Sequence, residues 1–400
     1  MNLRALIIFY LFSTVLSAQQ FEPGVIIDSI PVANSTNESF ALYLPIAYNT
    51  DIPSPVLIVF SPSGNGKEGV ETFVKAAETY NHIIVCSNNS RNGSLDRNIA
   101  IAQRLFNHVF SNFKISENRI YLAGFSGGSR LATAIATQSD QITGVIACGA
   151  GFIANPTYMP SKQNFAYAGL CGDRDMNFKE MVGVRKYLNR LNLRNTLFTF
   201  DGGHKWPPIE QILMAFAWLE IESLKNGHLK KPESEVMKGY TKNLEGAEIA
   251  IKNNQPLLAA AYYERAVNTY GSFFNLDSVS QKLQNIKKDK VYIKTLKSRE
   301  KAFNKEDVWT PILLKRFDSD YENPKNANLD WWDSVFKKLS KRGAKADSEM
   351  LNMIERLRFK VFVAAYMKNN SDSAKPRGDQ LVFCKALVLQ LYPKPNKDEL

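Results

Sequence analysis

The chain has 400 residues, of which 44% are hydrophobic and 22% are charged. This is the composition of a globular protein, and the length is enough for two domains. Beyond the N-terminal apolar segment no stretch approaches eighteen apolar residues, so a transmembrane helix is not expected in the mature chain. The net charge is +11, and residues 230–400 carry +10 of it, with 32 Lys and Arg against 22 Asp and Glu.

The first eighteen residues have the pattern of an export signal. Arg4 supplies a positive start, residues 5–16 are almost entirely apolar, and Ser17 and Ala18 are small residues suited to cleavage before Gln19. The apolar run is too short to span a bilayer comfortably. We therefore expect residues 1–18 to be a signal peptide and the protein to be secreted or periplasmic in a bacterium.

Predicted strands and helices alternate between residues 25 and 226, which favours an α/β fold with a doubly wound, mostly parallel sheet. The first two strands are expected to form an antiparallel edge. Three of the four cysteines fall in or at the end of predicted strands, so buried thiols are favoured over disulfides. The expected strands are 25–31, 39–46, 55–61, 82–87, 118–124, 142–149, 164–171 and 194–200, and the expected helices are 67–80, 95–113, 127–138, 178–192 and 207–226.

A serine stands at a sharp turn between a predicted strand and a predicted helix. The apolar residues 120–123 lead into 124–128 (GFSGG), and residues 129–137 follow with helical spacing. A G-x-S-x-G turn holds the serine in a strained conformation that lifts its hydroxyl above the sheet. Ser126 is therefore a candidate nucleophile, and the amide of Gly127 a candidate oxyanion donor; the alternative is a plain turn rich in small residues.

A serine nucleophile needs a histidine to accept its proton and a carboxylate to hold the histidine, and on this fold the chain order is Ser, acid, His. Two of the four histidines precede Ser126, and His228 stands in a polar segment after the last helix expected to pack on the sheet. His204 lies in the Gly-rich loop 201–208 (DGGHKWPP), directly after a predicted strand. His204 is therefore the candidate base.

The acid is expected between these two residues, after another predicted strand. Residues 172–178 (GDRDMNF) follow the strand at 164–171 and offer Asp173 and Asp175. We favour Asp175, because it lies three residues past Gly172 and could reach across to the histidine loop. Asp173 is the second candidate and Asp201 a distant third.

Taken together, GFSGG, GDRD and DGGHKWPP resemble motifs of the α/β-hydrolase superfamily. They are most similar to secreted esterases of the polyhydroxybutyrate-depolymerase and feruloyl-esterase type, over about residues 25–225. Those esterases usually carry His-Gly after the third strand, whereas here residues 61–66 read SPSGNG. Pro62 has no amide hydrogen, so Ser63 is the first-loop donor that the resemblance implies, beside Gly127. The short connection between residues 148 and 165 leaves no room for a large lid, so we expect an open pocket.

Strand patterning ends at the polar segment 227–232 (GHLKKP), which has the composition of a linker. We therefore divide the mature chain into a catalytic domain, residues 19–228, and a helical domain, residues 229–400. Residues 256–270 (PLLAAAYYERAVNTY), with the helix before them, resemble a tetratricopeptide-like pair, but no clean second copy follows. A generic helical bundle is the alternative, and a protein partner for it is left open.

The last four residues are Lys397-Asp398-Glu399-Leu400, which in a eukaryote would return a protein to the endoplasmic reticulum. We favour coincidence, because the catalytic half resembles bacterial exported esterases. The helical half interleaves its lysines with acidic and aromatic residues, so no nucleic-acid partner is expected.

The motifs predict hydrolysis of a small-molecule or polymer-linked carboxylic ester through Ser126, Asp175 and His204. No metal or organic cofactor is expected, because HExxH, clustered Cys/His and GxGxxG motifs are absent from the sequence. The first alternative is a serine peptidase of the same fold, because the triad does not distinguish an amide from an ester. The second is a binding protein in which the helical half carries the function.

Overall fold

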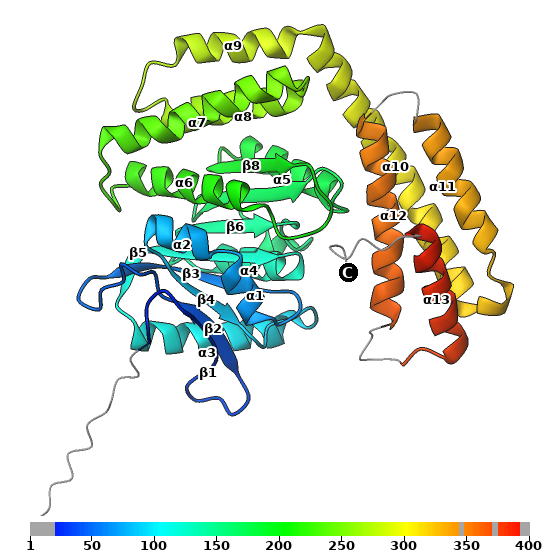
Figure 1. The fold of residues 1–400 in the computed structure, drawn as a ribbon, viewed down its shortest axis with the longest axis horizontal. Helices are drawn as coiled ribbons and strands as arrows, with labels where there is room; N and C mark the ends of the chain where they lie inside the picture. Colours follow the sequence, from blue (N-terminus) through cyan, green and yellow to red (C-terminus); the bar gives the residue numbers. More distant parts are fainter. Residues whose placement is uncertain (1–20, 344–347, 370–374, 393–400) are drawn as a thin grey trace, which may run out of the picture.

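The computed structural model describes residues 21–343, 348–369 and 375–392. The predicted signal peptide, residues 1–18, and the C-terminal residues 397–400 lie outside this part of the chain. Eight strands form one sheet in the order β1-β2-β4-β3-β5-β6-β7-β8 (Figure 1). Strands β1 and β2 are antiparallel to their neighbours and the others are parallel, as the sequence predicted.

The parallel strands are buried along almost their whole length, because helices cover both faces of the sheet. Helices α3, α4 and α5 pack on one face, and α1, α2 and α6 pack on the other. The architecture is a doubly wound, mostly parallel α/β sheet with an antiparallel edge, as expected. Its strands are β1 (Ile26–Pro31), β2 (Ser39–Tyr43), β3 (Ser54–Phe60), β4 (Ile83–Ser87), β5 (Ile115–Phe125), β6 (Gly144–Cys148), β7 (Ala166–Gly172) and β8 (Asn195–Phe200). Its helices are α1 (Gly66–Glu71), α2 (Val74–Tyr80), α3 (Leu95–Asn112), α4 (Gly127–Gln138), α5 (Phe178–Arg190) and α6 (Ile209–Lys225).

From residue 233 onward the described chain is helical, which agrees with the expected all-α region. Helices α7 to α9 lie beyond α6, and α10 to α13 form a separate bundle beside the sheet (Figure 1). These helices are α7 (Glu233–Lys252), α8 (Pro256–Tyr270), α9 (Asp277–Lys288), α10 (Lys290–Glu322), α11 (Leu329–Gly343), α12 (Ser348–Asn369) and α13 (Gly378–Leu391). The division at residue 228 and the tetratricopeptide-like pair stay predictions. Within the described residues, the helices lack an apolar stretch of the length needed to cross a bilayer.

Helix α8 of the helical region packs against the edge strand β8. Arg265 of α8 is buried, and its Nε and Nη2 donate to Thr196 Oγ1 at 3.0 Å and to the Leu197 carbonyl at 3.2 Å. Its guanidinium also lies 4.0 Å from the centre of the Phe198 ring. Burial lowers the pKa of Arg265 to about 10. Helix α8 therefore covers an edge of the sheet that would otherwise present unpaired backbone groups to solvent.

Candidate active site

Ser126 occupies the turn between β5 and α4 in a strained conformation, with φ +52° and ψ −116°. Backbone of this kind costs about 1–3 kcal/mol and is retained where the surroundings enforce it. Here the Ser126 amide donates to the Cys148 carbonyl at 2.8 Å. A Cβ on Gly128 would lie 1.9 Å from the carbonyl oxygen of Phe60, so only glycine permits the turn to pack against β3. The sharp turn predicted from GFSGG is therefore present.

His204 lies on the loop after β8 and connects Ser126 to Asp175. Its Nε2 is 2.9 Å from Ser126 Oγ, and its Nδ1 is 2.8 Å from Asp175 Oδ2. The Phe125 ring, centred 4.6 Å away, packs against the imidazole. The structure thus joins three residues from three loops at the carboxyl end of the sheet.

Asp175 is fully buried on the loop after β7. Its second carboxylate oxygen, Oδ1, accepts from the Asn177 amide at 2.8 Å. Burial raises the pKa of the neighbouring Cys171 thiol, and the charge of Asp175 raises it further, so this thiol stays protonated. The carboxylate is therefore fixed on both oxygens, with one of them directed at the imidazole.

The two other candidate acids have different partners. Asp173 Oδ1 accepts from the Gly202 amide at 3.2 Å, and its Oδ2 accepts from Asn352 Nδ2 at 3.0 Å. Burial raises the pKa of Asp173, while the Gly202 amide and Arg174 oppose that rise. Asp201 is exposed and forms an ion pair with Arg174. Neither carboxylate pairs with His204.

Helix α12 reaches this site from the distant helical bundle. Phe359 lies 5.6 Å from His204, measured between ring centres, and so covers part of the imidazole. Arg356 Nη1 donates to the Asp173 carbonyl oxygen at 2.9 Å. Its Nε bonds Glu306 of α10 at 2.9 Å, with both side chains fully buried. We expected an open pocket because residues 148–165 are too few to form a large lid. Helix α12 nevertheless covers part of the site.

The sequence analysis did not predict these contacts, because 155 residues separate Phe359 from His204 and 183 separate Arg356 from Asp173. A signal was nevertheless present. Apolar residues occupy both faces of the α12 sequence, and a helix of this kind is buried on both sides.

The two predicted oxyanion donors lie on neighbouring loops. Ser63 follows β3, and its amide is 3.4 Å from Ser61 Oγ, which is long for a hydrogen bond. Gly127 is the first residue of α4, where helical amides lack an intrahelical acceptor. A Cβ on Gly127 would lie 1.8 Å from Asn92 Oδ1, so the Asn92 side chain occupies that space. The oxyanion roles of Ser63 and Gly127 stay predictions.

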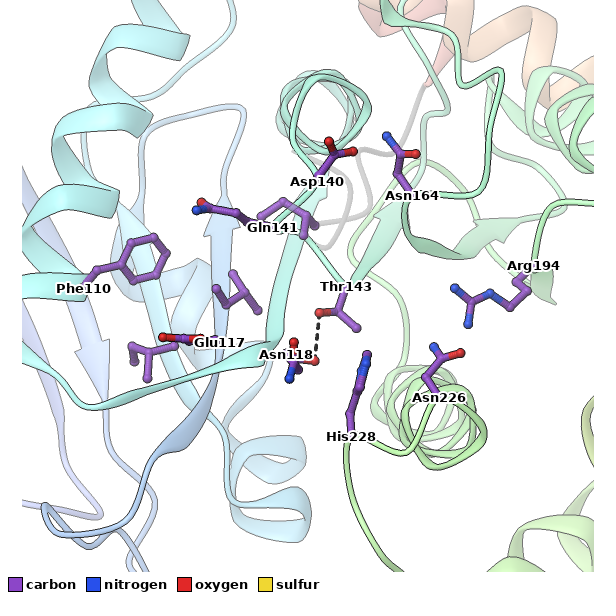
Figure 2. Close-up of a pocket in the computed structure, with 13 residues that line it drawn as sticks. Phe110, Glu117, Asn118, Asp140, Gln141, Thr143, Asn164, Arg194, Asn226 and His228 are labelled. Carbon is purple, nitrogen blue, oxygen red and sulfur yellow. Dashed lines mark hydrogen bonds between the residues drawn. The ribbon is translucent and has the colours of Figure 1, made fainter.

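The remaining histidines are used elsewhere. His82 is buried beside Glu220, and His108 Nδ1 accepts from the Ala33 amide at 3.0 Å. His228 lines a cavity of about 670 Å³ where β5, β6 and β7 begin, together with Thr143 and Arg194 (Figure 2). This cavity is at the end of the sheet opposite to Ser126, so it is separate from the group formed by Ser126, His204 and Asp175. Among residues 21–343, 348–369 and 375–392, no three His, Cys, Asp or Glu side chains are grouped as metal ligands.

Comparison with solved structures finds chains that are similar over about half of this sequence at low identity. No family model and no curated protein matches the sequence. The S-formylglutathione hydrolase of Staphylococcus aureus is 16% identical, with a TM-score of 0.42 over 49% of this chain and 95% of that chain. Esterase 2 of Thermogutta terrifontis is 12% identical, with a TM-score of 0.42 over 53% of this chain and 98% of that chain. Similarities this distant leave the function to be argued from the residues themselves.

Proposed function

We propose that this protein is a serine hydrolase that cleaves carboxylic esters. One observation carries the proposal: His204 lies 2.9 Å from Ser126 Oγ through Nε2 and 2.8 Å from buried Asp175 through Nδ1. Distances of this kind are those at which a base takes a proton from a nucleophile and a carboxylate orients the base. The strained turn at Ser126 supports the same role, because backbone strain of this kind concentrates at functional sites.

The reaction proceeds by acyl transfer. Ser126 Oγ attacks the ester carbonyl while His204 Nε2 takes its proton, and Asp175 stabilises the imidazolium that forms. The imidazolium then protonates the leaving alkoxide, and the acyl group remains on Ser126. Water, deprotonated by His204, then attacks the acyl carbon; the bond to Ser126 Oγ breaks, the imidazolium returns the proton to Ser126 Oγ, and the acid is released.

We assign stabilisation of the tetrahedral oxyanion to the amides of Gly127 and Ser63. The loop that carries Ser63 and the start of α4 are connected through Asn92: the Asn92 side chain lies against Gly127, and the Asn92 amide donates to the Pro62 carbonyl at 2.9 Å. Donors of this kind contribute a few kcal/mol each to lowering the barrier.

Ser126→Ala tests the proposal. The variant is expected to lose hydrolysis of p-nitrophenyl acetate and covalent labelling by a fluorophosphonate probe, while its thermal unfolding stays close to that of the native protein. Ser278→Ala, at an exposed serine of α9, is the matched control and should keep both activities. Persistent turnover in Ser126→Ala would reject the nucleophile. Faster turnover of aminoacyl nitroanilides than of esters would favour the peptidase alternative.

Export is part of the same proposal and is supported by the sequence of residues 1–18. A bacterial exported protein would begin at Gln19, which N-terminal sequencing of the mature chain would show. The alternative, retention in the endoplasmic reticulum through Lys397–Leu400, predicts that deleting these four residues releases the protein from a eukaryotic cell.

A further inference from the structure

Helix α12 has two apolar faces with different partners. Met353, Leu357 and Val361 lie in the core of the α10–α13 bundle. Phe359 stands on the opposite face and contacts His204, while Arg356, between the two faces, contacts both Glu306 of the bundle and the loop that carries Asp175. The helix therefore belongs both to the bundle and to the wall of the proposed active site.

Phe359 begins a row of rings along this second face. Its ring is stacked on Phe362 at 5.4 Å between centres, and Phe362 is stacked on Tyr366 at 6.4 Å. We call these three residues the aromatic strip. Phe359 and Phe362 are half-buried, whereas Tyr366 is 57% exposed. The strip thus runs from the imidazole of His204 toward solvent.

The proton transfer by His204 determines whether the alcohol or the acyl portion of an ester lies next to the aromatic strip. His204 Nε2 must give its proton to the leaving oxygen, so the alcohol portion of the ester lies on the His204 side. The acyl carbon is held at Ser126. Because the strip begins at His204, a long alcohol portion would extend along it.

We propose that the aromatic strip is the binding site for the alcohol portion of the substrate, and that it selects alcohols carrying an apolar ring. This inference rests on the proposed esterase function. A flat ring stacks on Phe or Tyr in offset or edge-on arrangements at the spacings already present in the strip. Binding energy from a part of the substrate that does not react can be used to orient the reacting carbonyl.

The full-length protein can be tested with two acetate esters that differ only at the far end of the alcohol. Propyl acetate and 3-phenylpropyl acetate form the same acetyl-enzyme, and their leaving groups are alike close to the oxygen. The ratio of their kcat/KM values therefore reports binding and acylation on the alcohol side. Acetate release is the readout, and we expect the phenyl ester to be favoured about tenfold. A ratio of one or below in the native protein would overturn the proposal without any variant.

Substitutions at Phe362 locate the effect, because this residue does not touch His204. Phe362→Ala is expected to bring the ratio close to one, mainly through KM, while Phe362→Tyr keeps a ring and should keep the ratio. Val382→Ala, at an exposed position of α13, is the control. An unchanged ratio in Phe362→Ala, or an equal loss in Phe362→Tyr, would contradict the proposal. Failure of the esterase assignment would be seen separately, because neither ester would then be hydrolysed.

Discussion

Two aspartates on one short loop have different tasks. Asp175 directs one oxygen at His204, whereas Asp173 binds the backbone of the histidine loop through Gly202 and the side chain of Asn352. Asp173 therefore holds two loops and α12 together, while Asp175 holds the imidazole. The sequence alone could rank these residues by their distance from Gly172, but could not show that both are used.

Asp175→Asn is expected to lower kcat by orders of magnitude, about 10⁴-fold in the best-studied triad, because an amide favours the wrong imidazole tautomer. Asp173→Asn keeps a side chain that can still accept one hydrogen bond, so its effect on kcat should be far smaller. Steady-state kinetics with p-nitrophenyl acetate compares the two. The reverse order of effects would assign the acid to Asp173.

At the scale of single elements, helix α12 stabilises the acid loop, the segment after β7 that carries Asp173 and Asp175. Arg356 connects the Asp173 carbonyl to Glu306, and Lys360 also bonds Glu306, at 2.6 Å. An arginine that is buried with its carboxylate is costly to remove, because the carboxylate loses a partner in a medium that solvates it poorly.

Arg356→Met is therefore expected to lower the free energy of unfolding by about 3 kcal/mol and to lower kcat more than it raises KM. Arg358→Met is the matched control on the same helix, since Arg358 pairs with Glu355 and lies over Phe336 instead. Urea unfolding and ester kinetics provide the two readouts. If Arg356→Met loses stability but keeps the native kcat, the contact with the acid loop has no part in catalysis.

Glu220 of helix α6 is another buried charged residue. It lies close to His82, Arg119 and Lys231. Burial by itself would raise the pKa of Glu220, but the His82 hydrogen bond and the charges of Arg119 and Lys231 lower it to about 2. Since the folded pKa is below the ordinary value of 4.5, the carboxylate stabilises the fold above about pH 4.5. This stabilisation is lost as the pH falls toward 2.

For Glu220 we expect a loss of roughly 2 kcal/mol in the free energy of unfolding between pH 5 and pH 3. Glu220→Gln should be less stable at pH 7, and its stability should depend less on pH over this interval. Glu210→Gln, at an exposed position of the same helix, should retain the native pH dependence. Urea unfolding at each pH gives the comparison, and identical curves for both variants would contradict the assignment.

The elements also show how far sequence patterns reach. Most strands and helices of the sheet were predictable within a few residues, because buried strands are continuous apolar runs and the helices between them are amphipathic. The single helix expected over residues 67–80 was wrong: the chain forms two helices there, α1 and α2, with Thr72 and Phe73 between them. The break between α9 and α10 is local: the Asp289 side chain accepts from the amides of Val291 and Tyr292, which caps the start of α10. The contact of Phe359 with His204 could not be predicted, because it depends on how distant segments pack.

At the scale of the whole molecule, the helical region and the sheet share several buried contacts. Ile221 of α6 packs with Val236 and Tyr270, and Phe303 of α10 packs against Phe178. Arg265 hydrogen bonds with β8. The parts of the chain before and after residue 228 therefore differ in composition but pack against each other.

These contacts lead to a prediction about shortened chains. A chain that ends at residue 228 retains Ser126, Asp175 and His204. It exposes apolar surface on α6, however, and it loses the contacts that α12 makes with the loops of Asp175 and His204. We expect it to be less stable by several kcal/mol, since each buried aliphatic or aromatic side chain that becomes exposed costs about 1.5–3 kcal/mol. We also expect kcat/KM for p-nitrophenyl acetate to fall at least tenfold, because the acid loop is no longer held.

A chain that ends at residue 289 separates the two effects. It keeps α7 to α9 and the Arg265 contacts with β8, but lacks α10 to α13. Its stability should lie closer to that of the full chain, whereas its kcat/KM should be as low as that of the shorter chain. Thermal unfolding and ester hydrolysis would be measured on all three chains. Native stability and activity in the chain ending at 228 would instead establish residues 19–228 as an independent catalytic domain, the division that the sequence predicts.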